Sequence, residues 1–161
     1  MKRFARELSR LRAEHQHLDR LSDALLTLIN SGDAACLQDV QPYWQEFHTV
    51  LTRHLKCEDW ILYPRLSSSA DQYLSVLAGN MFHELGGLSA QLAEFDAVWD
   101  QEARRQEPQA YLQAMRAILQ AVDHRAAREE LHLYPAAAKA EIAVQRGGFT
   151  AHGVDLMPSL A

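Results

Sequence analysis

The segment HLKCEDWILYP at residues 54–64 returns as HRAAREELHLYP at residues 124–135. In both copies a pair of acids precedes Leu-Tyr-Pro, and the two copies superpose on that tripeptide. A histidine opens each copy, four residues before the first acid in one and five residues before it in the other. Histidine and carboxylate side chains on one face of a helix are typical metal ligands, and the chain supplies this pair twice.

The composition favours one compact helical domain. The chain has 161 residues, 48% of them apolar, and is rich in Ala, Leu, Glu, Gln and Arg. The net charge of −5 and the lack of a continuous basic patch disfavour nucleic-acid binding. No apolar run approaches the roughly 18–20 residues of a membrane span, so we expect no membrane association. The N-terminus lacks the apolar core of a secretory signal, and two cysteines form no disulfide framework, which predicts a cytoplasmic location.

Four amphipathic segments predict four helices. Apolar residues recur at alternating steps of three and four over residues 3–30, about 39–64, 71–105 and 108–144. Gly86-Gly87 interrupts the third segment, and each glycine weakens a helix interior by up to about 1 kcal/mol. The pair therefore predicts a kink, or a place where another group approaches the backbone.

Short loops join these segments, so each helix must bury its apolar stripe against its neighbours. An all-α, up-down-up-down four-helix bundle is the economical solution. We expect the bundle to fill residues 1–145 and residues 146–161 to form a loop-like tail. The predicted inner stripe of the second helix is Phe47, Leu51, His54, Glu58 and Ile61.

Polar side chains on such stripes cost several kcal/mol unless something satisfies them. Each predicted helix offers at least one imidazole at similar depth, and two helices add a carboxylate. The candidate metal ligands are His15, His54, Glu58, His83, His124 and Glu129. A lone buried histidine is usually only hydrogen-bonded, but one histidine per helix together with two acids favours a shared metal site.

The spacings bear on which pairs can converge. Residues four apart on a helix differ by about 40° around the axis and by about 6 Å along it, so His54 and Glu58 can bind one centre. Residues five apart differ by about 140°. His124 and Glu129 would therefore converge only through a local π-type bulge or a long side-chain reach.

The chain resembles the hemerythrin-like domains of the HHE cation-binding type over residues 5–140. The resemblance rests on Glu14-His15 in the first helix, His54 and Glu58 with Leu-Tyr-Pro in the second, His83-Glu84 in the third, and His124 and Glu129 with Leu-Tyr-Pro in the fourth. Both the four-residue and the five-residue spacing match the hemerythrin pattern.

This resemblance implies a non-haem di-iron centre inside the bundle, with two iron ions joined by an oxo or hydroxo bridge. It implies three pairs of ligands: His15 with His54 on one iron, His83 with His124 on the other, and Glu58 with Glu129 bridging the two. Oxygen-carrying hemerythrins have a further histidine where this chain has Gly87. That difference suggests an iron open to water, O2, NO or peroxide.

The resemblance further implies binding of O2, NO or reactive oxygen species for sensing, storage, scavenging or repair of damage, with a separate redox partner. Gly87 favours an alternative, a di-iron enzyme acting as a peroxidase, an oxidase or an NO-handling catalyst. A mononuclear site, or zinc or manganese in place of iron, also satisfies the ligand chemistry. A bundle that has lost its metal would act as an interaction module.

Overall fold

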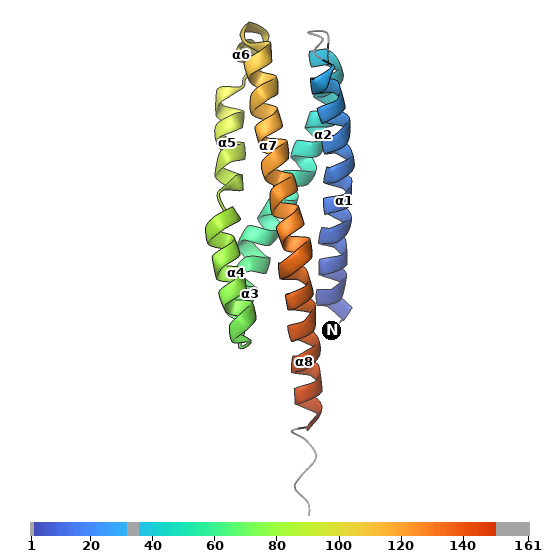
Figure 1. Cartoon of the computed structure of the whole chain (residues 1–161), viewed down its shortest axis with the longest axis vertical. Coiled ribbons are helices and arrows are strands. Elements are labelled where there is room, and N and C mark those ends of the chain that lie inside the picture. The colour runs from blue at the N-terminus through green and yellow to red at the C-terminus, as the bar shows by residue number, and fades with distance from the viewer. Residues whose placement is uncertain (1, 32–35, 151–161) are drawn as a thin grey trace, which may run out of the picture.

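The chain folds into an elongated bundle of helices that run alternately up and down its long axis (Figure 1). The computed structural model describes residues 2–31 and 36–150. This part of the chain contains no strand, so the expected all-α, up-down-up-down bundle is confirmed. None of its helices combines the length and apolar character that a bilayer crossing requires.

Four rods make up the bundle. The first rod is α1 (Lys2–Asn30). The second consists of α2 (Cys36–Cys57), one π-helical segment, η1 (Glu58–Leu62), and α3 (Tyr63–Ser67). The third consists of α4 (Gln72–Leu85), α5 (Leu88–Val98) and the short α6 (Gln101–Gln106). The fourth consists of α7 (Pro108–Arg128), a second π-helical segment, η2 (Glu129–Leu133), and α8 (Tyr134–Thr150).

Local sequence signals set the ends of α4. The Asp71 side chain accepts a hydrogen bond from the backbone N–H of Leu74 at 3.0 Å and so caps the helix start. Gly86-Gly87 separates α4 from α5, as the two glycines predict. A Cβ atom at Gly86 would lie 2.6 Å from the carbonyl oxygen of Phe82, so this break leaves no room for a side chain at its first residue.

Two boundaries differ from the expectation. The segment predicted as one helix over residues 71–105 is three helices, and Asp100 caps the last of them. α8 continues to Thr150, although Gly147-Gly148 favoured an earlier end, because glycine weakens a helix without preventing it. The rest of the expected tail, residues 151–161, lies outside the described residues.

Two hydrophobic clusters fill the bundle, one toward each end. The first joins α1, α2, α5 and α7, and its fully buried members include Leu25, Phe47, Leu51, Tyr111, Met115 and Leu119. The second joins α1, α3, α4 and α8, and its fully buried members include Leu11, Leu62, Tyr63, Met81 and Tyr134. Between the two clusters the first, second and fourth rods bury charged and polar side chains in the middle of the bundle.

We expect Leu119→Ala to lower the free energy of unfolding by about 2–5 kcal/mol, because Leu119 is fully buried and its truncation leaves a cavity in the first cluster. Leu131→Ala is the matched control. Leu131 is 70% exposed, so its loss should change the stability by less than about 0.5 kcal/mol. Urea unfolding followed by circular dichroism measures both changes, and equal effects would contradict this placement of the core.

Candidate metal centre

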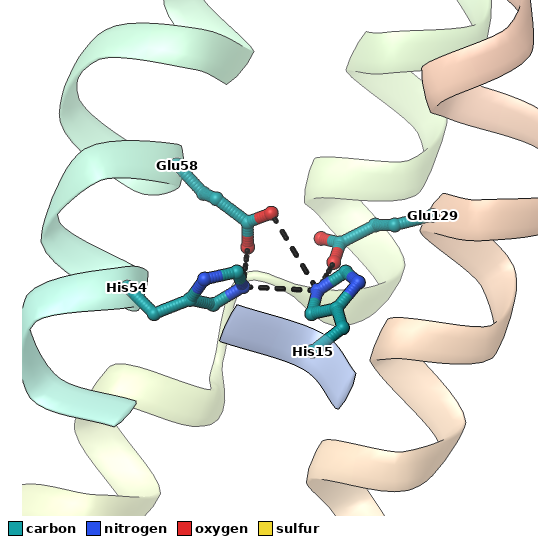
Figure 2. Close-up of side chains that lie close together, drawn as sticks. All are labelled: His15, His54, Glu58 and Glu129. Atoms are coloured by element: carbon teal, nitrogen blue, oxygen red, sulfur yellow. Dashed lines mark hydrogen bonds and ion pairs between the residues drawn. The ribbon is translucent and has the colours of Figure 1, made fainter. Parts of the chain in front are cut away.

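Four buried side chains from three rods meet in the middle of the bundle (Figure 2). They are His15 from α1, His54 from α2, Glu58 from η1 and Glu129 from η2. One nitrogen or oxygen atom from each lies within 4.8 Å of the corresponding atoms of the other three. All four belong to the six ligands that the sequence predicts, and we call them the His/Glu cluster.

The separations within the His/Glu cluster suit a metal ion. His15 Nε2 lies 2.9 Å from His54 Nε2 and 3.3 Å from Glu129 Oε2. His54 Nε2 lies 3.3 Å from Glu58 Oε2. Neighbouring ligand atoms that each lie about 2.0–2.2 Å from one ion are about 3 Å apart, so these atoms can share a single ion.

A carboxylate holds the far side of each imidazole. His54 Nδ1 lies 3.0 Å from Glu14 Oε2, and His15 Nδ1 lies 3.0 Å from Glu130 Oε1. Because an ionised carboxylate only accepts, each Nδ1 donates its proton, and the lone pairs on the two Nε2 atoms then face each other. Such lone pairs repel unless a proton or a cation lies between them. Carboxylate–histidine pairs of this kind usually support metal-binding histidines.

One carboxylate oxygen of the His/Glu cluster is buried without a hydrogen-bond partner. This atom is Glu129 Oε2, and a hydrogen bond to it from His15 Nε2 at 3.3 Å requires a second proton on that ring. An unsatisfied buried acceptor costs about 1–3 kcal/mol, and more when it is charged. The unpartnered oxygen and the facing imidazoles therefore fit a bound metal cation.

Two tyrosines fix the carboxylates. Tyr63 donates to Glu129 Oε1 at 2.8 Å, and Tyr134 donates to Glu58 Oε1. The tyrosine of each Leu-Tyr-Pro motif therefore reaches the glutamate of the other motif. Burial and the adjacent carboxylates raise the pKa of both hydroxyls, so both remain donors.

Arg125 is the functional candidate that the sequence reasoning missed. Its guanidinium is 3% exposed and donates from Nε to Glu129 Oε1 at 2.8 Å. Nη2 donates to Glu58 Oε2 at 2.9 Å and to Asp59 Oδ1 at 2.6 Å. Burial acts to lower the pKa of Arg125, but the three carboxylates outweigh it and raise that pKa, so the charge is permanent. The signal was its spacing, because Arg125 precedes Glu129 by four residues, as His54 precedes Glu58.

The structure does not bring His83 or His124 to the His/Glu cluster, which corrects the expected second pair of ligands. His83 is exposed on α4. The side chain of His124 is 61% exposed and lies 3.9 Å from Glu84, on the surface. The bulge expected between His124 and Glu129 begins instead at Glu129, so the two are separated by regular helix and point about 140° apart.

The charges of the cluster follow from these contacts when no ion is bound. Burial is the largest single influence on both His54 and Glu58 and opposes their ionisation, but the attraction between them and the other charges around them together outweigh it. The pKa of His54 is raised to about 9, with a contribution from Glu14, and the pKa of Glu58 is lowered to about 2. Burial and the negative charge of Glu58 raise the pKa of Glu129. Without metal, the imidazole of His54 is therefore positively charged at neutral pH, and a metal ion that binds there would displace its extra proton.

Two open spaces adjoin the His/Glu cluster. One is a cavity of about 10 Å³ that borders His15, His54, Glu129 and Arg125. Its apolar wall is formed by Leu18, Leu51, Leu55, Leu88, Val122 and Ala126. This volume is about what one water-sized molecule needs. The other is a surface groove of about 310 Å³ between the first and fourth rods, which extends to His15.

The bundle and its donor set define a helical protein whose centre fits a metal cation. The family model described as Hemerythrin HHE cation binding domain matches residues 6–137. This match covers most of the chain, so the chain belongs to the hemerythrin HHE cation-binding family, as its motifs predict. No curated protein and no solved structure matches the chain significantly.

We expect the protein without metal to lose stability as the pH rises from 6.5 to 9. The folded state raises the pKa of His54 from 6.5 to about 9, so its protonation favours folding fully below pH 6.5 and ceases to do so above pH 9. The loss should be on the order of 3 kcal/mol. Melting temperatures recorded against pH in the presence of a chelator measure it. In the His54→Gln variant the melting temperature should change little between pH 6.5 and 9. If it falls as much as in the unmodified protein, His54 is not the group responsible.

Proposed function

We propose that this hemerythrin-like protein binds iron at the His/Glu cluster and that O2, NO or peroxide binds at that iron. The observation that carries the proposal is the convergence of two imidazoles and two carboxylates, one of which has an unpartnered oxygen. When bound, iron would supply a redox-active centre with affinity for these small ligands. Sensing, storage, scavenging or repair of oxidative damage are the roles that such binding serves.

The donor set supports iron. Mixed nitrogen and oxygen ligands suit iron, whereas softer thiolate sites select other metals. Zinc and manganese accept the same donors, so the metal is identified by measurement. A reducing compartment such as the cytoplasm suits ferrous iron and also the free thiol of Cys57.

The small cavity supports a diatomic ligand. It lies against both imidazoles on the side of the first hydrophobic cluster, and five of its ten lining residues are leucines or Val122. A space of about 10 Å³ is close to what one water molecule needs, so it suits a very small ligand better than a larger substrate. The apolar wall offers such a ligand no hydrogen bonds, so the polar groups around it are those of the His/Glu cluster and Arg125.

A di-iron or single-iron enzyme is the second candidate, and the surface groove favours it. The groove extends from solvent to His15, whose carboxylate partner Glu130 forms part of its wall. A reductant or a separate redox partner could approach the centre along this route. Repeated consumption of O2, NO or peroxide with an added reductant would indicate an enzyme, whereas saturation at a fixed ratio of ligand to iron would indicate a binder.

His54→Ala should weaken binding of ferrous iron by about 100-fold or more, because it removes a ligand from a preformed buried site. Anaerobic calorimetric titration measures the affinity. His83→Ala and His124→Ala are the matched controls, because both histidines are exposed and outside the cluster. Equal losses in all three variants would contradict the four-residue site.

Optical titration tests which small molecule binds. The iron-loaded protein is kept anaerobic and is then titrated with O2 or with NO. We expect spectral changes that saturate with at most one small ligand per iron, because the cavity beside the cluster has little more space than one water molecule needs. Iron-loaded protein that responds to neither gas nor peroxide would overturn the proposed ligand. Protein that takes up no iron would overturn the proposed function as a whole.

A further inference from the structure

The two halves of the bundle are related by a shift of 71 residues. This shift converts Glu58 into Glu129 and Tyr63 into Tyr134, and it carries η1 onto η2 residue for residue. The same shift converts His54 into Arg125, rather than into His124. The chain therefore has a repeated site in which the second copy replaces an imidazole with a guanidinium.

The contacts follow the same relation. His54 Nε2 lies 3.3 Å from Glu58 in the first half, and Arg125 Nε lies 2.8 Å from Glu129 in the second. The two tyrosines cross over, each to the glutamate of the other half. Arg125 also donates to Asp59, which corresponds to Glu130, the carboxylate that holds His15.

The second half also lacks a counterpart of His15. The residue 71 positions after His15 is Gly86, at the break between α4 and α5. A Cβ atom there would meet the Phe82 carbonyl oxygen at 2.6 Å, so a ligand side chain does not fit. In its place Arg125 Nη1 lies 3.4 Å from the carbonyl oxygen of Leu85 and donates to it.

We infer that this protein holds one metal ion and that the Arg125 guanidinium occupies the position of a second. The inference rests on the proposed function and specifies its centre. Arg125 joins Glu58 and Glu129, the two carboxylates expected to bridge a pair of ions. A guanidinium has no lone pair to offer a metal, and its permanent charge repels a cation from its own side of the carboxylates. The ion is bound on the other side, among the two imidazoles and the unpartnered oxygen of Glu129.

The number of iron ions per folded chain tests this inference and separates it from the proposed function. Elemental analysis after anaerobic loading with ferrous iron and desalting should give one iron per chain. After oxidation, the electron paramagnetic resonance signal of an isolated high-spin ferric ion should account for all of the iron, because a coupled pair gives none. Two irons per chain would overturn the inference and leave the proposed function standing. No iron would overturn the proposed function.

Arg125→Gln tests the guanidinium directly. Removal of one positive charge beside both carboxylates should tighten binding of ferrous iron by about tenfold or admit a second ion. Arg128→Gln is the matched control, because Arg128 lies three residues further along the same rod and pairs with the half-exposed Glu84 at the surface. We expect Arg128→Gln to bind one iron with unchanged affinity.

A folded Arg125→Gln protein with the stoichiometry and affinity of the unmodified chain, or with weaker binding, would overturn the assignment of Arg125. If that variant does not fold, Arg125→Lys decides, because it keeps the charge while changing the hydrogen-bond geometry. One iron per chain in Arg125→Lys supports the inference, and two irons overturn it.

Discussion

Negative charge buried in the middle of an apolar bundle is the constraint on which this structure depends. Glu58 and Glu129 are fully buried between two hydrophobic clusters, where an isolated carboxylate would be too costly to keep ionised. Arg125 neutralises one side of both, and the imidazoles of His15 and His54 face the other. The helices can therefore pack around Glu58 and Glu129 only because these positive and polar groups compensate the buried negative charge.

Much of the fold could be predicted from the sequence because the apolar periodicity is strong and the interruptions are explicit. The four segments, the break at Gly86-Gly87 and the family follow from patterns local to each helix. Four of the six residues predicted as ligands also lie together in the His/Glu cluster. His54 and Glu58 are four residues apart, a spacing that needs no knowledge of the tertiary structure to place them together.

The π-helical segments explain what the sequence did not predict. Each adds one residue relative to a regular helix, so the stripe behind it rotates by about 100°. The sequence analysis placed Ile61 on the buried stripe of the second helix, but Ile61 is 57% exposed and Leu62 is buried instead. In the fourth rod the sequence analysis named His124 and overlooked Arg125, because arginine is almost never buried unless it is paired. The four-residue spacing to Glu129 is a local signal, but the other partners of Arg125, Glu58 and Asp59, come from the second rod, and no local pattern reveals them.

The ion pairs of Arg125 have a consequence for how the centre matures. The guanidinium is part of the polypeptide, so it is present as soon as the chain is made and a chelator cannot remove it. Unlike a redox-active metal ion, it also keeps a single charge state. It draws Glu58 and Glu129 together without any help from the metal. A metal cation can therefore bind after folding to a site that is already formed, so the bundle can fold even when the metal is scarce.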